Sequence, residues 1–320
     1  MVTTNSYIQL LRCPDCEEGG LAVSHPPARA LVCKACAAVY PLADDRPVLL
    51  RHDNALFSIG AYGRAKVTAG SGRVMAGRWV PSPSVNLASE RVLGQLRARL
   101  DAAPTPATVL VVGGGSQREW LDPRLRASAE RLVIYTDIDA GADVELFCDG
   151  HDLPFKDSSF DAVVTTAVLE HVIYPERVAA EITRVLKPGG LLYSELPFMQ
   201  QVHEGAYDFT RYTLSGHRRL FNGFAAIEAG MVAGPATALV WCIENFVLAF
   251  VTRPLSRKIA KTLVRIAFAW LKYFDFLLAK RPEAMDGASC TFLFGQKAAT
   301  HIPDAEIISG YVGAKHLRHT

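Results

Sequence analysis

The sequence has little net charge and no long hydrophobic run. Its 34 Lys and Arg residues nearly balance its 32 Asp and Glu residues, leaving a formal net charge of +2. A dedicated nucleic-acid-binding protein usually has a strong basic excess, so such a partner would have to meet a local basic patch. The most apolar stretch, residues 238–251, is shorter than the roughly 20 residues of a membrane-spanning helix and contains Glu244 and Asn245. A transmembrane helix is therefore not expected.

The N-terminal residues also lack the features of a secretory signal. Residues 1–11 show no basic segment followed by an apolar core and a small-residue cleavage site. We therefore expect a cytoplasmic protein, in which cysteines seldom form disulfides. Of the seven cysteines, four form two close pairs, whereas Cys148, Cys242 and Cys290 are isolated in apolar stretches. The isolated cysteines are expected in the core, and the pairs are expected to bind metal.

Two CxxC pairs predict a structural zinc site. The four expected ligands are Cys13, Cys16, Cys33 and Cys36. Each CxxC turn can direct two thiolates at one ion, and two turns complete a tetrahedral shell that leaves no position open for catalysis. Two disulfides or four unrelated thiols are the less favoured alternative, and a redox CxxC is disfavoured because it needs no matching second pair. This N-terminal sequence resembles the small zinc-ribbon-like activator domain of tRNA and protein methyltransferases. The resemblance includes Tyr40-Pro41 and the ending Pro47-Val48-Leu49-Leu50.

The pattern along the chain predicts five segments. They are a four-cysteine ribbon at 1–50, a linker at 51–84, a catalytic domain at 85–300 with an apolar helical insertion at 236–282, and a C-terminal tail at 301–320. In the catalytic domain, short apolar runs alternate with helical patterns, which is typical of a parallel sheet covered by helices. The expected strands are 108–112, 132–136, 144–147, 162–166, 191–196, 225–228 and 291–294. The expected helices are 86–100 and 176–186, the second closed by a tight turn at 187–190.

A glycine-rich turn and two carboxylates indicate a nucleoside site. Gly113, Gly114 and Gly115 directly follow the first strand, where glycine permits close backbone approach to a ligand. The bulky Arg118 argues against a dinucleotide fingerprint. Asp137 ends the second strand, where it can accept hydrogen bonds from ribose hydroxyls, and Asp149 ends the third, where it can accept one from an adenine amino group. Together these features suit a nucleoside that carries no pyrophosphate.

From about Val109 to Phe198, the sequence resembles that of class I S-adenosylmethionine-dependent methyltransferases of the methyltransferase type 11 kind. The similar motifs are residues 149–155, 157–161, 169–172 and 184–190, in the family's order and spacing. The resemblance implies an α/β, Rossmann-like seven-stranded sheet whose last strand is antiparallel. It implies S-adenosylmethionine as cofactor, bound by Gly113, Gly114, Gly115, Asp137, Ile138, Asp149, Gly150 and Thr166. Val111 stands where the family usually has an acidic residue and Gln117 where it often has glycine, so the amino end of the cofactor must find other partners.

The loop after the fifth strand, residues 197–213, is dense in histidine, carboxylate and aromatic side chains. We expect His203 to act as general base, Asp208 to orient it, and Arg211 to hold a polar or anionic part of the acceptor. The alternative, held equally, is that Asp208 and Arg211 form a structural ion pair. Glu170 and His171 are secondary candidates. The loop resembles a subset of class I enzymes, many of which look like tailoring enzymes for cell-surface glycans.

The apolar insertion has two interpretations. Its second helix places four basic residues on a narrow stripe, Lys258, Lys261, Arg265 and Lys272. The broad opposite side is apolar: Ile259, Leu263, Ile266, Trp270, Phe274 and Leu277. The favoured interpretation is a lid or dimer contact packed over the substrate pocket. The other is a peripheral contact of residues 238–280 with an anionic membrane surface, at the inner face of the membrane.

Three functions remain open from the sequence. The leading one is O-methylation of a small-molecule or glycan-type acceptor. The second is RNA base methylation, for which four basic residues of the linker would be the RNA-contacting patch: Arg64, Lys66, Arg73 and Arg78. The third is a catalytically silent scaffold, suggested by the missing acidic residue at Val111.

Overall fold

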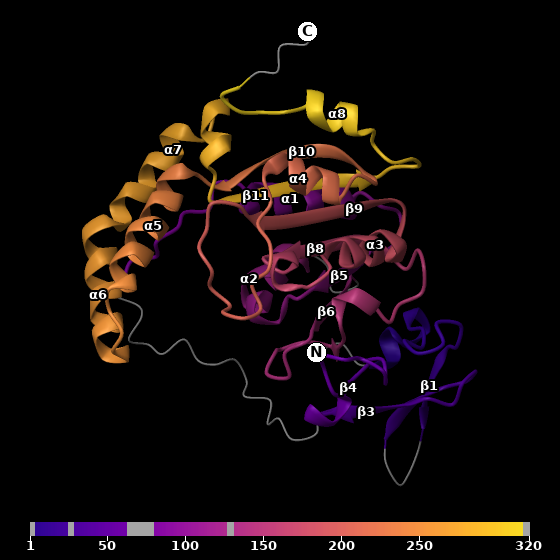
Figure 1. Cartoon of the computed structure of the whole chain (residues 1–320). Helices are drawn as coiled ribbons and strands as arrows, with labels where there is room; N and C mark the ends of the chain where they lie inside the picture. Colours follow the sequence, from indigo (N-terminus) through magenta and orange to yellow (C-terminus); the bar gives the residue numbers. More distant parts are fainter. Residues whose placement is uncertain (1–3, 25–28, 63–79, 127–130, 316–320) are drawn as a thin grey trace. The chain divides into compact units, whose positions relative to one another are not determined.

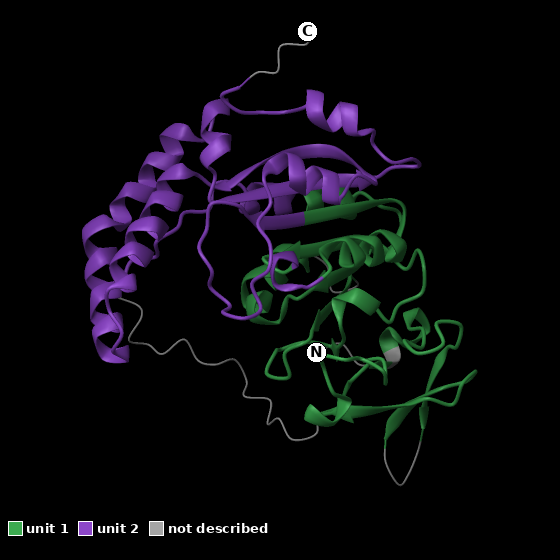
Figure 2. Ribbon diagram, viewed as in Figure 1, with its two compact units in different colours: residues 1–72, 95–168, 174–193 green, residues 73–94, 169–173, 194–320 purple. Residues whose placement is uncertain are grey.

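The structure is a computed structural model that describes residues 4–24, 29–62, 80–126 and 131–315 (Figure 1). The basic linker residues 64, 66, 73 and 78, proposed above as an RNA-contacting patch, lie outside the described residues. By contact density the chain forms two compact units (Figure 2). Unit 1 contains residues 1–72, 95–168 and 174–193, and unit 2 contains residues 73–94, 169–173 and 194–320.

A seven-stranded sheet has the order β10-β11-β9-β8-β5-β6-β7. Its strands are β5 Thr108–Val112, β6 Leu132–Asp137, β7 Leu146–Phe147, β8 Phe160–Thr166, β9 Leu186–Pro197, β10 Phe224–Ala233 and β11 Cys290–Lys297. Strand β5 pairs in parallel with β6 and β8, and β6 pairs in parallel with β7. Strand β11 is antiparallel to β10. The expected α/β class and Rossmann-like seven-stranded sheet are confirmed.

The N-terminal cysteine module is a four-stranded sheet in the order β1-β2-β3-β4. The strands are β1 Leu21–Ser24, β2 Ala30–Cys33, β3 Val39–Ala43 and β4 Arg46–Pro47. Isolated bridges join Leu11 to Phe155 and Val48 to Phe147, and all four side chains are fully buried. The ribbon therefore packs against other residues of unit 1 through these apolar side chains, and its expected boundary at residue 50 stays a prediction.

The interior of unit 1 is made of strands without exposed faces. Val109 to Val111 of β5 and Val133 to Tyr135 of β6 are completely buried, as expected for a parallel sheet covered on both faces. Helices α2 Arg118–Leu125 and α3 Pro175–Val185 belong to this unit, and α1 Ser89–Asp101 precedes β5. A tight turn was expected at residues 187–190, but in the structure these residues belong to β9, which begins at Leu186. Gly189 within this strand has φ +72°.

Unit 2 carries the remaining helices, α4 Leu214–Leu220, α5 Pro235–Ala249, α6 Pro254–Phe268, α7 Phe274–Leu278 and α8 Asp304–Ser309. The buried carboxylate of Glu244 on α5 accepts a 2.6 Å hydrogen bond from Arg265 on α6. The buried Asp275 on α7 accepts from the backbone N–H groups of Ala236 and Thr237 at the start of α5. Polar contacts at buried positions therefore fix the three helices to one another.

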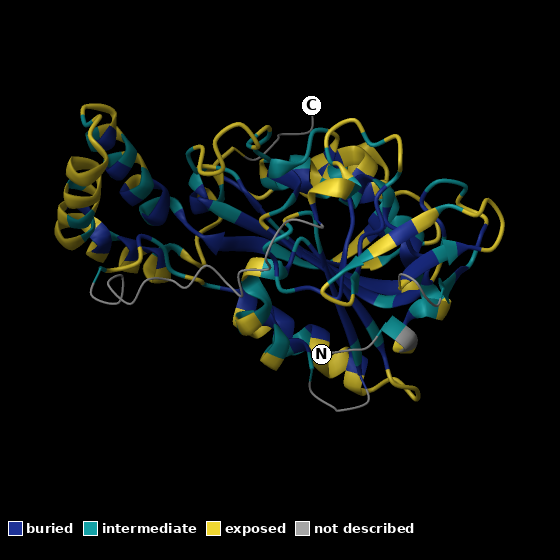
Figure 3. Ribbon diagram, turned by 90° about the horizontal axis from the view of Figure 1, so that it is seen from below, coloured by how far each residue is buried: buried dark blue, intermediate teal, exposed yellow. Residues whose placement is uncertain are grey.

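The insertion presents its apolar side outward. Leu263 and Ile266 are each 61% exposed, whereas Lys272 is buried and donates to the carbonyl oxygen of Ser82. Exposed residues run along these helices, which lie on the left in Figure 3. The exposed apolar side differs from the expected lid, in which that side would pack over the chain's own pocket, whereas the dimer contact stays a prediction. Arg265 faces Glu244, while Lys258 of the same basic stripe is exposed. Over the described residues, every helix is too short or too polar to cross a bilayer.

Candidate functional site

The glycine-rich turn follows β5 and is tightly packed. Gly113 has φ +67°, and a Cβ added there would lie 2.5 Å from Cγ2 of Val168. A Cβ at Gly115 would lie 2.3 Å from Cβ of Ala142. Glycine is therefore required by the packing of the turn itself, and its presence alone does not identify a ligand.

Asp137 lies at the C-terminal end of β6, beside this turn. Its carboxylate accepts hydrogen bonds from the backbone N–H groups of Gly115 (3.1 Å), Ile138 (2.8 Å) and Asp139 (3.1 Å). Burial raises the pKa of Asp137, although these N–H groups act in the opposite sense. An ionised carboxylate has about four acceptor positions, so it retains capacity for a further donor such as a ribose hydroxyl. The residues present therefore fit the nucleoside that the sequence predicts.

Asp149 is held from two directions. Its Oδ1 accepts from the backbone N–H of His151 at 2.9 Å and contacts the ring Nδ1 of His151 at 2.6 Å, and its Oδ2 accepts from the amide of Asn54 at 2.9 Å. Burial alone would raise the pKa of Asp149, but the hydrogen bonds from His151 and Asn54 bring it below its usual value. Asp149 is thus an oriented, ionised acceptor, and its contact with adenine stays a prediction.

We call the residues around Asp137 and Asp149 the nucleoside cradle. Two further residues of this cradle were missed by the sequence analysis, because they lie in the stretch interpreted as linker. Asn54 contacts Asp149, and the hydroxyl of Tyr62 donates to the carbonyl oxygen of Ile138. Tyr62 is only 5% exposed and packs against Phe147, with ring centroids 5.2 Å apart. An aromatic residue in a Gly- and Ser-rich stretch was the available signal. Asn54 and Tyr62 therefore lie beside the residues expected to bind the nucleoside.

The end of β8 carries a reciprocal pair of hydrogen bonds. The amide of Gln117 donates to the carbonyl oxygen of Thr166 at 3.0 Å, and the hydroxyl of Thr166 donates to Oε1 of Gln117 at 2.7 Å. Gln117 thus gives Thr166 a partner at the position where related sequences often have glycine. A Cβ on Gly150 would make ordinary contacts with Val178, so this glycine is not required sterically.

The four N-terminal cysteine thiols converge on one point. All four sulfur atoms lie within 4.8 Å of one another, and the Cys13–Cys36 and Cys16–Cys33 separations are 3.7 and 3.6 Å. Tetrahedral Zn–S bonds of about 2.3 Å place sulfur atoms roughly 3.8 Å apart, so the cluster fits a zinc ion closely. A Cβ on Gly19 would lie 2.1 Å from Sγ of Cys33, so this glycine leaves room for the ligand.

Hydrogen bonds lead from the cysteine cluster toward Asn54. The Cys13 sulfur lies 3.1 Å from the Tyr40 hydroxyl, which donates to Asp15 at 2.6 Å. The other oxygen of Asp15 accepts from the backbone N–H of His52 at 2.9 Å. His52 is two residues before Asn54, so the cluster and the nucleoside cradle share one short segment.

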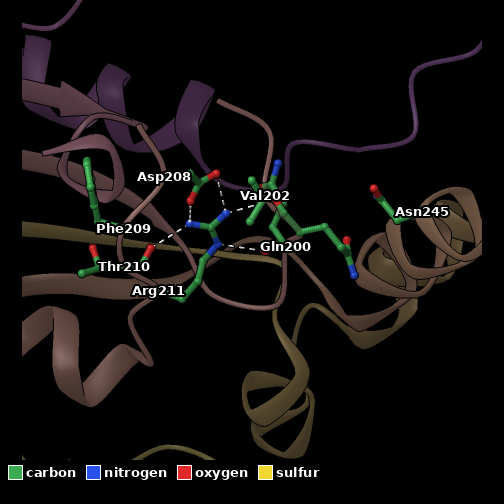
Figure 4. A pocket seen from close by; sticks show the side chains of 8 residues that line it. Gln200, Val202, Asp208, Phe209, Thr210, Arg211 and Asn245 are labelled. Carbon is green, nitrogen blue, oxygen red and sulfur yellow. Dashed lines mark hydrogen bonds and ion pairs between the residues drawn. The ribbon is translucent and has the colours of Figure 1, made fainter. Parts of the chain in front are cut away.

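In unit 2, Asp208 and Arg211 form a closed polar clamp (Figure 4). The guanidinium of Arg211 donates to both carboxylate oxygens of Asp208 and to three carbonyl oxygens, those of Gln200, Gln201 and Thr210. Because these contacts use all five N–H groups of an arginine, the geometry favours the ion-pair alternative over acceptor binding by Arg211. The clamp borders an open depression of about 560 Å³, which Val202, Phe209 and Asn245 also line.

His203 lies close to the buried carboxylate of Glu170. Its Nε2 lies 4.0 Å from Oε1 of Glu170, and Nε2 of His171 lies 3.6 Å from the same oxygen. Glu170 is completely buried, and neither of its carboxylate oxygens has a hydrogen-bond partner among the described residues. Burial raises the pKa of Glu170 to about 7, although Arg211 acts in the opposite sense. Asp208 holds the backbone N–H of His203 at 2.9 Å, so the predicted base, its orienting residue and both secondary candidates form one cluster.

Comparison with known proteins finds a similarity over the central segment of the chain. Residues 112–194 match the model of the methyltransferase domain family Methyltransf_11. The ubiquinone/menaquinone biosynthesis C-methyltransferase UbiE of Bordetella avium (strain 197N) is 36% identical over 107 residues, which cover 32% of this chain and 40% of that relative. The demethylmenaquinone methyltransferase of Clavibacter sepedonicus is 52% identical over 42 residues, 13% of this chain and 17% of that relative.

Among solved structures, the Haemonchus contortus phosphoethanolamine N-methyltransferase 2 in complex with S-adenosyl-L-methionine is 16% identical with a TM-score of 0.40. That match covers 67% of this chain and 54% of the other. The present chain spans about 40% of the length of the Bordetella relative. The glycine turn, Asp137 and Asp149 all lie inside the matched segment, so the part of the chain that is similar to the methyltransferase domain model is the part that holds the predicted cofactor residues.

Proposed function

We propose that this protein is an S-adenosylmethionine-dependent methyltransferase that methylates a hydroxyl group of a small-molecule or glycan-type acceptor. The observation that carries the cofactor assignment is the carboxylate of Asp137, which ends β6 beside the glycine turn and retains room for a ribose donor. The family match over residues 112–194 supports the same assignment. The loop from Pro197 to Thr213, which gathers His203 and its partners, supports a polar acceptor.

The chain's own residues have separate tasks in this proposal. Asp137 and Asp149 hold the nucleoside, and Gln117 with Thr166 supplies polar groups at the end of β8. When bound, S-adenosylmethionine supplies a methyl group on a positively charged sulfur. In this proposal His203 would take the proton of the acceptor hydroxyl, so that the oxygen could receive the methyl group that bound S-adenosylmethionine would supply.

The ribbon has a structural role in this proposal. Its four thiolates bind one zinc ion and complete its tetrahedral shell, so no position is open for water or substrate. The zinc ion stabilises the segment that ends at Asn54 and thereby the cradle.

Calorimetric titration with S-adenosylhomocysteine tests the cofactor site. Asp137→Ala should weaken binding by more than tenfold. The matched control is Asp139→Ala, two residues along, because Asp139 is exposed and accepts from Gly141. Equal binding by the parent and Asp137→Ala, or no binding by the parent, would reject the assignment.

Methyl transfer to a panel of acceptors then separates the alternatives. Transfer of labelled methyl to hydroxylated glycans or small molecules supports the proposal. Transfer to the ring carbon of a quinone would instead follow the reaction named for the UbiE relatives, and transfer to RNA would favour the second function. Cofactor binding without any transfer would favour a scaffold.

We also propose that the insertion contacts an anionic membrane surface peripherally. Residues 246–281 contain eight basic residues and one acidic residue, Asp275, which is buried. The exposed side combines aliphatic residues such as Leu263 with Trp270 and Tyr273, flanked by the exposed Arg253 and Lys258. Apolar residues, interfacial aromatics and surrounding positive charge are the combination that suits a helix lying in the headgroup region of anionic lipid.

A further inference from the structure

We propose that Glu170, His171 and His203 form a binding site for one divalent transition-metal cation, distinct from the cysteine cluster. One ligand atom from each residue lies within 4.8 Å of the other two. Two imidazoles and one carboxylate are a donor set that suits first-row metals such as zinc, iron or cobalt, and they leave coordination positions open. The site does not depend on the proposed methyl transfer.

The imidazole tautomers are set by carbonyl groups. Nδ1 of His171 lies 2.7 Å from the carbonyl oxygen of Tyr207, and Nδ1 of His203 lies 3.2 Å from that of Gln201. Because a carbonyl oxygen only accepts, each Nδ1 carries the proton and each Nε2 keeps its lone pair. Both Nε2 atoms are the ones nearest to Oε1 of Glu170. Outer hydrogen bonds of this kind orient histidine ligands in metal sites.

The carboxylate provides an independent reason for a cation. Glu170 is 0% exposed, and both of its oxygens lack a hydrogen-bond partner among the residues that the structure describes. Leaving such a group unsatisfied is costly, whereas a bound cation would satisfy it. The two histidine side chains are 20% and 26% exposed, so a cation can enter from solvent.

The distances require only a small adjustment. Metal–ligand bonds of about 2.0–2.1 Å place neighbouring ligand atoms roughly 3.0–3.4 Å apart. The observed 3.6 Å separation from Glu170 would shorten by about 0.2–0.6 Å and the 4.0 Å separation by about 0.6–1.0 Å. The Arg211 clamp fixes the carbonyl groups of Gln200 and Gln201 just before His203, which limits movement away from this geometry.

A cation here would change how the acceptor is activated, an extension that does rest on the proposed function. It would lower the pKa of a hydroxyl that contacts it. Nε2 of His203 would then be a ligand, and the acceptor's proton would pass to water instead of to His203.

Cobalt is the probe that distinguishes the two sites. Full-length protein with zinc already in the ribbon is titrated with Co²⁺ in the absence of cofactor. We expect one further equivalent of metal, with visible d–d absorption and without the near-ultraviolet band of thiolate-to-cobalt charge transfer. His171→Ala, His203→Ala and Glu170→Gln should each weaken cobalt binding by more than about 100-fold, beyond the 10- to 100-fold effect of losing an outer-shell partner. His301→Ala is the matched control, because this exposed histidine contacts the side chain of Asn222 and is no member of the cluster.

Two results would overturn the site: cobalt bound only with thiolate bands, or His171→Ala and His203→Ala variants that bind cobalt like the parent. Both histidines are partly exposed, so these variants carry the test even if Glu170→Gln does not fold. Calorimetry with S-adenosylhomocysteine on the same samples separates this outcome from failure of the proposed function.

Discussion

The side-chain amide of Asn54 donates a 2.9 Å hydrogen bond to Oδ2 of Asp149, which lies 95 residues further along the chain. The contact joins the segment that follows the ribbon to the carboxylate predicted to contact adenine. Under the proposed function, Asn54 would position Asp149 for the cofactor.

Removing this donor should weaken cofactor binding. Asn54→Ala is expected to raise the Kd for S-adenosylhomocysteine about 5- to 10-fold, the equivalent of one hydrogen bond of about 1 kcal/mol. Asn54→Asp should raise this Kd further, because it places a second carboxylate beside Asp149. Calorimetry measures both, with Asn222→Ala as the control. Unchanged affinity in Asn54→Asp would show that the contact has no part in binding.

Zinc content should depend on one glycine and not on its neighbour. In Gly19→Ala the new Cβ would lie 2.1 Å from Sγ of Cys33, whereas Gly20→Ala meets nothing within 4 Å. We expect Gly19→Ala to contain clearly less than one zinc per ribbon and to unfold at lower temperature, with Gly20→Ala close to the parent. Elemental analysis and thermal unfolding provide the measurements. Equal zinc content in the two variants would contradict the assigned geometry.

Arg211 should stabilise the loop rather than bind the acceptor. Arg211→Ala leaves the buried Asp208 carboxylate without its cation, which should cost about 3 kcal/mol of unfolding free energy. Arg211→Lys should recover less than half of this, because an ammonium group cannot reproduce the five-donor fork. Denaturant unfolding measures the loss. The exposed pair of Arg219 and Asp304 supplies the control, since Arg219→Ala should cost less than about 1 kcal/mol.

The buried His217 should make the protein sensitive to mild acid. Its nitrogens contact the hydroxyl groups of Ser194 and Thr291, and burial lowers its pKa to about 3. The unfolded chain, with a histidine pKa of about 6.5, binds a proton that the folded chain excludes between pH 6.5 and pH 3. Stability therefore falls as pH drops through this window, by up to about 1.4 kcal/mol per pH unit from this group.

Denaturant unfolding at several pH values, for the parent and His217→Gln, isolates this contribution. The variant should lose stability less steeply below pH 6.5, even if it is less stable at neutral pH. Parallel curves would show that His217 does not exclude the proton.

Vesicle sedimentation tests the exposed side of α6. We expect binding to anionic vesicles, little binding to neutral ones, and weakening at high salt. The double variant Leu263→Ser with Ile266→Ser should reduce binding at least fivefold. Ile308→Ser, which changes a similarly exposed residue on α8, should not. Equal sedimentation of the parent with and without vesicles would exclude the membrane contact and leave a contact between two copies as the remaining interpretation.

The sheet could be predicted from the sequence because its strands contain short apolar runs, such as Val109 to Val112 in β5. The strand β6 ends at Asp137, where the motif places it, and the order of apolar runs and helices defines a parallel arrangement. The roles of Asn54 and Tyr62 could not be predicted, because these residues contact Asp149 and Ile138, which lie 95 and 76 residues away in the sequence. The periodicity of apolar residues along a short segment cannot predict contacts between residues so far apart in the sequence.

The sequence pattern of α6 also could not predict which side of this helix packs against the protein. Helical spacing separates a basic stripe from an apolar side, but either side can face the protein. The deciding group is Glu244, a buried carboxylate on a different helix, which attracts Arg265. Likewise, the loop composition drew attention to His203, but its closeness to Glu170 follows from the fold and not from spacing.

The chain of contacts from Cys13 through Tyr40, Asp15 and His52 toward Asn54 has an evolutionary consequence. Under the proposed function, selection on the cofactor site should act also on residues whose side chains lie away from it. Homologues that keep the four cysteines should keep Asp15 and an amide at position 54 together, and lineages that discard the ribbon should be free to vary both. Paired gain and loss of these positions across an alignment would trace when the module became part of the cradle.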